Sequence, residues 1–250
     1  MDDTSRTKRG KIQTMSAKEM KVCVVIPAYN EEAVIKDVVE DMRNELKKTN
    51  LSYEIVVIND GSKDTTSIQA SKGGAKVIDH ILNSGAGGAT ATGLSYANQN
   101  GFDFAVTMDA DGQHLPKDVI RGLNAAKQRG CDLLIGSRLI DNKGMSRVKV
   151  LGNQGLSLIT FLLFKVSVTD SQSGLRVFSK RALQSLRWKT SGYEFCSEML
   201  WRAKQLGLNI TEYPITAVYT EYSKSKGQNN WNAINIVKSL VRRRLIEAFE

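Results

Sequence analysis

The stretch that decides the fold reads Phe104-Ala105-Val106-Thr107-Met108-Asp109-Ala110-Asp111-Gly112-Gln113-His114-Leu115-Pro116. The apolar run at its start predicts a buried strand, and Pro116 is well suited to open a helix. Ligands of open α/β sheets bind at the carboxyl ends of the strands. Two carboxylates at that position, Asp109 and Asp111, predict a hard-oxygen site for a divalent cation that carries a diphosphate. The alternative is a solvated acidic turn, because Asp-x-Asp also arises by chance.

Strands and helices alternate on both sides of this stretch. Strands are predicted at 22–26, 53–58, 75–79, 104–108 and 131–136, and helices at 31–48, 65–71 and 116–129. A glycine-rich loop at 83–88 is predicted to lead into a further helix that continues through Gln99. This alternation implies right-handed crossovers and a Rossmann-like, mostly parallel central sheet flanked by helices. The predicted fold class is therefore α/β.

The pattern changes after Ser137, where further helices are predicted at 148–164, 181–186, 194–206 and 231–249, and strands at 175–178 and 210–214. The simplest organisation is a flexible tail over residues 1–20, one domain over 21–227 and a C-terminal amphipathic basic helix within 228–250.

The composition is typical of a globular protein with one large core. The chain has 250 residues, and 41% of them are apolar. No apolar run reaches the roughly 20 residues that span a bilayer, and residues 1–20 lack the apolar section of a secretory signal. Three widely spaced cysteines, an odd number, indicate buried thiols in a reducing compartment. We therefore expect a cytoplasmic location.

The formal charge of +9 suggests a nucleic-acid partner, although net charge by itself indicates partners only loosely. Basic residues outnumber acidic ones from Lys224 to Glu250, and such a segment can meet nucleotides, nucleic acid or lipid headgroups. A non-catalytic nucleotide or nucleic-acid binding protein is therefore one hypothesis. The chain has no basic stripe interleaved with aromatic residues and no recognised nucleic-acid motif, so no nucleic-acid partner is expected.

Four stretches point to one family. They are Pro27-Ala28-Tyr29-Asn30-Glu31-Glu32, Asn59-Asp60-Gly61-Ser62-Lys63-Asp64, Asp109-Ala110-Asp111 and Asp170-Ser171-Gln172-Ser173-Gly174-Leu175-Arg176. In this order they resemble the family 2 glycosyltransferases, and most closely dolichyl-phosphate mannosyltransferase and similar polyprenyl-phosphate glycosyltransferases. The resemblance runs over about 21–227 and implies the GT-A fold, with a nucleotide-sugar half (21–136) and an acceptor half (137–227).

The resemblance places a nucleotide-sugar donor at the ends of the first strands. It implies donor contacts from Pro27, Tyr29, Glu31, Asp60, Gly87, Asp109, Ala110 and Lys226. The side-chain chemistry agrees, because Tyr29 can lie along a base or ribose while Glu31 and Asp60 accept hydrogen bonds from base N–H or ribose hydroxyl groups. The structural alternative is a helix cap at Asn30 and a surface turn at Asp60.

The resemblance also assigns a metal ion to the acidic pair. It implies that Asp109, Asp111 and Gln113 hold Mg2+ or Mn2+ against the sugar diphosphate. The ion would neutralise charge that develops on the leaving nucleoside diphosphate. His114 is expected to anchor the loop instead of binding the metal.

Three arginines, Arg138, Arg147 and Arg176, are candidates to clamp an acceptor phosphate, since a planar guanidinium can meet two phosphate oxygens. The resemblance implies catalytic roles for Asp170, Arg138 and Arg176. A phosphomonoester is already ionised near pH 7, so Asp170 would then orient arginines or substrate. A hydroxyl acceptor would instead need a general base, and Asp170 or Glu198 would be that base.

The C-terminal helix carries an apolar stripe of Trp231, Ile234, Val237, Val241 and Leu245 with basic residues beside it. Such a helix either packs on the core, or lies on an anionic membrane surface or a membrane-protein partner. Many members of the family carry transmembrane helices after this region. A separate membrane subunit, or a soluble acceptor, is therefore expected for this chain.

Taken together, these features predict a metal-dependent inverting glycosyltransferase. It would move a sugar from a UDP-sugar or GDP-mannose to a polyprenyl or dolichyl phosphate at the cytoplasmic face of the membrane. Transfer to a saccharide or protein hydroxyl is the alternative reaction.

Overall fold

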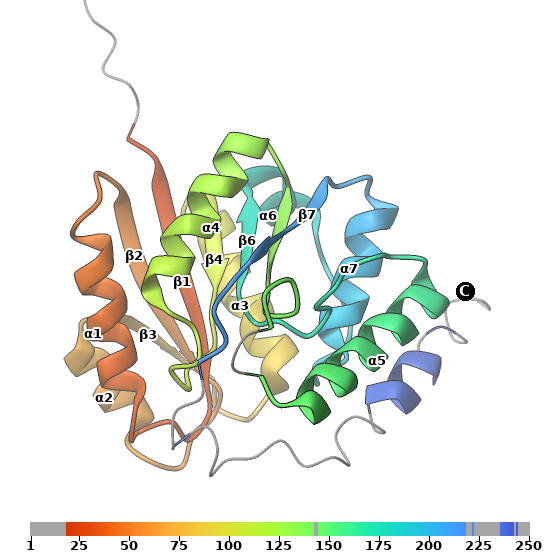
Figure 1. The fold of residues 1–250 in the computed structure, drawn as a ribbon. Helices are drawn as coiled ribbons and strands as arrows, with labels where there is room; N and C mark the ends of the chain where they lie inside the picture. Colours follow the sequence, from red (N-terminus) through yellow and green to blue (C-terminus); the bar gives the residue numbers. More distant parts are fainter. Residues whose placement is uncertain (1–18, 143–144, 219–221, 223–235, 243, 245–250) are drawn as a thin grey trace, which may run out of the picture.

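A single mixed sheet of seven strands forms the centre of the molecule (Figure 1). The computed structural model describes residues 19–142, 145–218, 222, 236–242 and 244. The strands are β1 (Lys21–Ala28), β2 (Ser52–Asn59), β3 (Lys76–Asp79), β4 (Phe104–Thr107), β5 (Leu133–Ser137), β6 (Arg176–Ser179) and β7 (Ile210–Pro214). Their spatial order is β3-β2-β1-β4-β6-β5-β7. The predicted α/β class is confirmed.

The direction of β6 brings an extra loop to the ligand edge of the sheet. Pairing is parallel between β1, β2, β3 and β4 and between β5 and β7, whereas β6 runs antiparallel to both β4 and β5. Parallel neighbours place their carboxyl ends along one edge. Because β6 runs the other way, the loop that precedes it, residues 170–174, meets those carboxyl ends.

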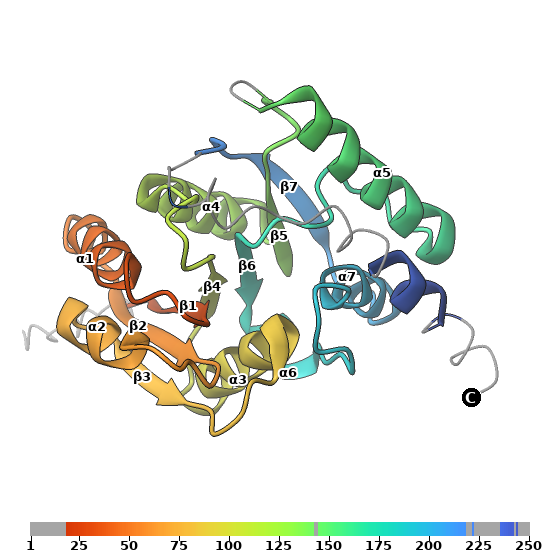
Figure 2. The same ribbon diagram turned by 90° about the horizontal axis from the view of Figure 1, so that it is seen from below.

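Helices cover both faces of this mostly parallel sheet (Figure 2). Their bounds are α1 (Ile35–Leu46), α2 (Thr66–Gly73), α3 (Gly85–Gln99), α4 (Pro116–Arg129), α5 (Arg147–Phe164), α6 (Lys180–Ser185) and α7 (Phe195–Gln205). One core cluster joins the sheet to α1, α2 and α4, and a second joins it to α3, α6 and α7. Helix α5 runs along the outer side of the molecule, beyond β7 and α7.

The sequence of β1 explains its central place. Residues Val22 to Ile26 are fully buried, and their side chains alternate between the two core clusters. Cys23 and Val25 enter the cluster under α3, while Val22, Val24 and Ile26 enter the one under α1. A strand covered on both faces needs such a continuous apolar run. The prediction of a doubly covered strand here is confirmed.

The start of α1 differs from the prediction. The helix begins at Ile35 with Val34 as its N-cap residue, so the predicted cap at Asn30 is wrong. Asn30 instead has a positive φ of 53°, and its side-chain oxygen accepts a hydrogen bond from Lys63 N at 2.9 Å. Its own N–H donates to Ser62 Oγ at 2.9 Å. Asn30 therefore ties the loop after β1 to the loop after β2, which a local reading of the sequence does not show.

The described part of the C-terminal segment packs on the core. Residues 236–242 are helical, Leu240 is fully buried, and Ile236 packs against the core cluster under α3. Trp231, Ile234 and Leu245 lie outside the described residues, as does the predicted tail up to residue 18. Among the described residues, no helix combines the length and apolar character needed to cross a membrane.

Candidate active site

The predicted metal-binding residues share one loop at the carboxyl end of β4, on the lower edge of the sheet in Figure 1. His114 Nε2 lies 2.9 Å from Asp109 Oδ2, and the His114 side chain is almost fully buried. The N–H of Gln113 donates to Asp111 Oδ1 at 3.0 Å, and its side-chain amide also contacts Asp111. The predicted anchoring position of His114 agrees with this geometry, because its ring orients the Asp109 carboxylate.

The loop before β6 approaches Asp109 from the other side. A Cβ built on Gly174 would lie 2.1 Å from Asp109 Oδ1, a distance that real side chains do not adopt. The backbone oxygen of Gly174 accepts a hydrogen bond from Thr107 Oγ1 at 2.8 Å. Only glycine fits at position 174 while the carboxylate keeps this place.

The pKa values of the Asp109 and Asp111 carboxylates are shifted in opposite directions. The protein atoms around Asp109 disfavour the charged carboxylate, although half of the side-chain surface is exposed to solvent. The nearby His114, Arg138 and Arg176 side chains together have the larger effect, and they lower the pKa of Asp109. Burial raises the pKa of Asp111, and repulsion from Asp109 raises it further. Two crowded carboxylates of this kind favour a bound cation, which relieves the repulsion between them.

An ion pair stands beside the acidic loop. Arg138 Nε and the Nη2 atom donate to the two oxygens of Asp170 at 2.7 and 2.9 Å. Asp170 is completely buried, whereas the Arg138 side chain keeps 19% of its surface exposed. The N–H groups of Thr169 and Asp170 donate to Glu212 of β7, which fixes the backbone around the pair. This arrangement holds the guanidinium in one orientation at the ligand edge.

Arg176 has a different place from the predicted one. Its guanidinium is buried, with 2% of the residue exposed, and donates to the backbone oxygens of Ser171 at 2.7 Å and Ser173 at 3.0 Å. It also lies against Cys196 and Met199 of α7. Arg176 therefore shapes the 170–174 loop from inside and is not placed to touch an acceptor phosphate. Arg147 lies exposed in the first turn of α5.

The residues predicted to bind the donor differ in their exposure to solvent. Tyr29 is 42% exposed, and the Glu31 carboxylate accepts a hydrogen bond from Tyr222 at 2.7 Å. Pro27 lies at the end of β1, and Ala110 lies in the loop that follows β4. Tyr222 therefore lies on the donor side, whereas Lys226 lies outside the described residues.

Asp60 is enclosed, with 2% of its surface exposed. Its carboxylate accepts hydrogen bonds from Ser84 N and Oγ at 2.8 and 2.7 Å and from Gly85 N at 2.8 Å, and it lies 2.8 Å from His80 Nδ1. Burial alone would raise the pKa of Asp60, but these bonds outweigh it and lower the pKa. Asp60 thus fixes the start of α3, so the predicted contact between its carboxylate and a nucleotide does not fit this conformation.

Gly87 has a packing role of the same kind. Its N–H donates to Ser191 O at 2.7 Å, and a Cβ at this position would lie 2.6 Å from Thr190 O. The glycine-rich sequence therefore lets α3 approach the loop before α7 closely. The structure shows Gly87 against protein backbone, where the resemblance implies nucleotide.

Comparison with known proteins decides the family. The model of Glycosyl transferase family 2 matches residues 23–196, which include most of β1, the acidic loop and the Asp170 loop. The chain belongs to glycosyl transferase family 2. Among its relatives, the UDP-N-acetylglucosamine–dolichyl-phosphate N-acetylglucosaminyltransferase of Methanococcus voltae is 43% identical over 231 residues, covering 83% of this chain and 90% of the relative.

Two further comparisons agree with this membership. The undecaprenyl-phosphate mannosyltransferase of Micrococcus luteus is 31% identical over 219 residues, covering 83% of this chain and 87% of the relative. A crystal structure of Mycobacterium tuberculosis glucosyl-3-phosphoglycerate synthase with Mn2+, UDP-glucose and phosphoglyceric acid matches with a TM-score of 0.69 and 22% identity, over 91% of this chain and 79% of that one. The GT-A fold and the assignment as an enzyme are confirmed.

The loop before α7 contributes residues to this family 2 site that the sequence reading missed. The surrounding protein atoms raise the pKa of Tyr193, and the nearby carboxylates of Asp109, Asp111 and Glu31 raise it further. The Tyr193 side chain is 55% exposed. Its only signal in the sequence is an aromatic residue between Gly192 and a helix, which is too common to single out.

Glu198 holds that loop in place. Its carboxylate is completely buried and accepts hydrogen bonds from Lys189 N at 3.1 Å and Thr190 N at 2.8 Å. Arg202 lies 3.6 Å from it as an ion-pair partner. These bonds give Glu198 a structural role in the glycosyltransferase and oppose the alternative that it acts as a general base.

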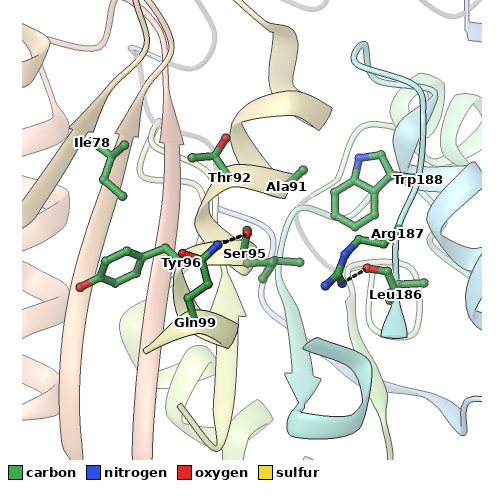
Figure 3. A pocket seen from close by; sticks show the side chains of 10 residues that line it. Ile78, Ala91, Thr92, Ser95, Tyr96, Gln99, Leu186, Arg187 and Trp188 are labelled. Atoms are coloured by element: carbon green, nitrogen blue, oxygen red, sulfur yellow. Dashed lines mark hydrogen bonds between the residues drawn. The ribbon is translucent and has the colours of Figure 1, made fainter. Parts of the chain in front are cut away.

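A concave region of about 490 Å³ lies beside α3, away from the acidic loop (Figure 3). Tyr96, Thr92 and Ile78 line it on one side, and Trp188 and Arg187 on the other. Trp188 Nε1 donates to Gly87 O at 3.2 Å, so this wall supports the start of α3. No carboxylate lines the region, and it is therefore not the predicted metal site.

Proposed function

We propose that this family 2 enzyme transfers a sugar, with inversion, from a nucleotide sugar to a polyprenyl or dolichyl phosphate, and that it needs Mg2+ or Mn2+. The observation that carries the proposal is the pairing of two sites at one sheet edge. The Asp109–Asp111 loop is suited to a metal diphosphate, and the Arg138–Asp170 pair beside it is suited to a phosphate.

The acidic loop fits a metal ion that is held partly by substrate. Within the described residues, no cluster of three or more His, Cys, Asp or Glu side chains could hold an ion by itself. Asp109, Asp111 and the Gln113 amide supply a small set of oxygen ligands, as is usual for Mg2+ that also binds phosphates and water. When bound, the ion would stabilise the negative charge of the departing diphosphate.

The Arg138–Asp170 pair favours a phosphate acceptor over a hydroxyl acceptor. Asp170 is completely buried, and both of its oxygens accept hydrogen bonds from Arg138, so it is poorly placed to remove a proton from substrate. A lipid phosphate is already ionised near neutral pH and needs no base. Arg138 can therefore orient the acceptor while Asp170 orients Arg138.

The proposed reaction breaks the bond between the anomeric carbon and the donor diphosphate. An oxygen of the acceptor phosphate forms the new bond to that carbon from the opposite face, which inverts its configuration. The nucleoside diphosphate leaves with the electron pair of the broken bond. Asp109 and Asp111 face the leaving side, and Arg138 faces the acceptor side.

For the donor we propose a UDP-sugar first and GDP-mannose second. The Methanococcus voltae relative, named for UDP-N-acetylglucosamine and dolichyl phosphate, is 43% identical to this chain. The relative named as an undecaprenyl-phosphate mannosyltransferase is 31% identical. The higher identity supports UDP-N-acetylglucosamine as the donor to test before the others.

The direct test is transfer of radiolabelled sugar from UDP-N-acetylglucosamine, other UDP-sugars and GDP-mannose to a short-chain polyprenyl phosphate with Mn2+ or Mg2+. The proposal expects organic-extractable product that disappears with a chelator. An Asp111→Asn variant is the matched control, because it keeps the shape of the side chain and removes its charge. Product from none of these donors would overturn the acceptor assignment.

A further inference from the structure

Within the part of the chain that the structure describes, helix α5 leaves an apolar face exposed. Only Ser157, Thr160 and Phe164 of its 18 residues are buried. The side chains that point outward include large apolar ones whose exposed fractions run from 42% to 75%: Val148, Leu151, Leu158, Phe161 and Leu162. Positions 148, 151, 158 and 162 follow the spacing of one helix face. Contiguous exposed apolar surface of this size marks an interaction site.

The charged side chains of α5 and of its C-cap residue are all basic. Arg147 lies in the first turn of α5 and Lys165 directly follows its last turn, so a cation stands at each end of the apolar stripe. Lys165 Nζ lies 5.6 Å from the centre of the Phe161 ring. The helix sequence from Arg147 to Phe164 contains no Asp or Glu. Long basic side chains beside an apolar face can extend their charge to the level of lipid headgroups.

A groove at the amino-terminal end of α5 adds a second observation. It has a volume of about 470 Å³ and is lined by Arg147, Val150 and Leu151 together with Asn142, Met145 and Gln154. The apolar part of this lining continues the exposed face at Leu151. A cation beside apolar side chains matches the chemistry of an anionic lipid, whose phosphate adjoins its hydrocarbon chains.

The inner face of the same helix forms hydrogen bonds with the segment 169–171 at the start of the loop before β6. Ser157 Oγ accepts a hydrogen bond from Ser171 N at 3.0 Å and donates to Thr169 O at 3.0 Å. These two residues flank Asp170, which orients Arg138. The outer face of α5 is therefore connected, through the hydrogen bonds of Ser157 on the inner face, to the loop that carries the proposed phosphate site.

We propose that the protein docks on an anionic lipid bilayer through the outer face of α5, with Val148, Leu151, Leu158, Phe161 and Leu162 in the headgroup region. The inference rests on the proposed function, because docking would bring the enzyme to the membrane that contains its proposed lipid-phosphate acceptor. A helix of this kind lies in the plane of the membrane and buries its apolar face about 5–10 Å deep. Docking is thereby assigned to α5, whereas the described C-terminal helix buries Leu240 in the core.

A second copy of the chain is the rival occupant, because the stripe also has the spacing of a helix-pairing seam. Charge argues against it. Two α5 helices that meet face to face bring Arg147 close to Arg147 in the parallel arrangement, or to Lys165 in the antiparallel one, and α5 offers no acidic residue to compensate. Anionic lipid headgroups instead attract the same basic side chains.

The test compares two double variants of the full chain in co-flotation with vesicles. Leu158→Gln with Leu162→Gln alters the proposed face, and Ile81→Gln with Leu82→Gln alters apolar residues of the loop before α3 that are even more exposed. With vesicles of phosphatidylcholine and phosphatidylglycerol, the α5 variant is expected to lose partitioning by about tenfold or more, and the control variant to match the unaltered protein. Pure phosphatidylcholine should bind all three proteins more weakly.

A fluorescent label reports the contact directly. The cysteines Cys23, Cys131 and Cys196 are buried, so a polarity-sensitive dye will react selectively with an introduced Leu158→Cys or Leu82→Cys residue. Addition of anionic vesicles should shift the emission of the label at position 158 to the blue and leave the label at position 82 unchanged. Equal responses at both positions would contradict the assignment.

Three outcomes overturn the proposal. They are absence of vesicle binding by the unaltered protein, full vesicle binding by the α5 variant, and a dimer in light scattering that this variant converts to monomer. The proposed reaction is measured separately with a water-soluble short-chain acceptor, on which the α5 variant should keep its activity. Failure of that reaction in the unaltered protein would count against the proposed function and leave the vesicle result to decide the docking surface.

Discussion

Gly174 faces Asp109 so closely that an added Cβ would lie 2.1 Å from the Asp109 carboxylate. The contact joins the loop before β6 to the loop after β4, two segments that are far apart in the sequence. It means that the position of the proposed metal-binding carboxylate depends on the acceptor-side loop. The proposed donor and acceptor sites therefore share this contact between their loops.

Gly174→Ala should displace Asp109 and reduce kcat/KM by about a hundredfold, the usual cost of moving a reacting group by about 1 Å. Gly152→Ala is the matched control, because a Cβ at Gly152 meets no atom within 4 Å. The control should keep full activity and, as an exposed helical glycine, should gain up to about 1 kcal/mol of stability. Steady-state kinetics and thermal unfolding measure both effects. Unchanged kinetics for Gly174→Ala would contradict the prediction, because they would show that the added Cβ does not disturb the function of Asp109.

Arg138→Ala should remove the proposed acceptor clamp and leave the donor site intact. We expect kcat/KM for the acceptor to fall by about a hundredfold or more, as for other groups that stabilise charge in the reaction. Stabilisation of the folded protein by UDP with Mn2+ should persist, since we assign Arg138 to the proposed acceptor side. Loss of both acceptor turnover and UDP binding would place Arg138 in the donor site instead.

Asp170→Asn tests whether a base is needed. If Asp170 only orients Arg138, the variant should lose activity by a similar factor at every pH between about 6 and 9, because no proton transfer is altered. The measurement is the pH profile of kcat in both proteins. A titrating limb that is present in the unaltered enzyme and absent from the variant would support a general base and a hydroxyl acceptor.

Asp60 should give the protein a pH-dependent stability. Its pKa is lowered in the folded state relative to its ordinary value of 3.8, so its contribution is fully present above that value and is lost as the pH falls through the lower, folded pKa. Asp60→Asn should therefore be less stable by about 1 to 3 kcal/mol at pH 7, and the difference should shrink below about pH 4. Urea unfolding at several pH values checks this, with a constant difference as the contradicting result.

The raised pKa of Asp111 makes a prediction about the metal. A proton on Asp111 competes with the ion, so Mn2+ affinity should decrease as the pH falls toward that raised pKa. Titration of Mn2+ in the presence of UDP at several pH values measures the effect. In Asp111→Asn the residual affinity should be weaker and should depend less on pH, and an equal dependence in both proteins would assign it to another group.

The sequence predicted the parts of the fold that depend on local pattern. The continuous apolar run Val22 to Ile26 is sufficient to indicate a strand covered on both faces, and Pro116 does open α4. The place of the acidic pair follows from the same logic, since it directly succeeds a buried strand. These features need no knowledge of distant segments, and the structure agrees with them.

The sequence could not show which partners the motif residues find. Asp60 and Arg176 stand at family positions, yet their hydrogen bonds go to Ser84, Gly85 and Ser171, which meet them only after the chain has folded. A motif gives the place of a side chain along an edge, whereas burial and nearby backbone groups decide what it binds. The outward direction of the apolar face of α5 was hidden for the same reason, because periodicity identifies a face and not its neighbour.

The central claim is that Asp109 and Asp111 hold a divalent ion against the donor diphosphate. The most direct measurement is an anomalous difference map from a crystal grown with Mn2+ and UDP. We expect one manganese peak within about 2.5 Å of a carboxylate oxygen from this pair and of a diphosphate oxygen. Clear density for UDP with the manganese bound elsewhere, or with no manganese peak at the pair, would contradict it.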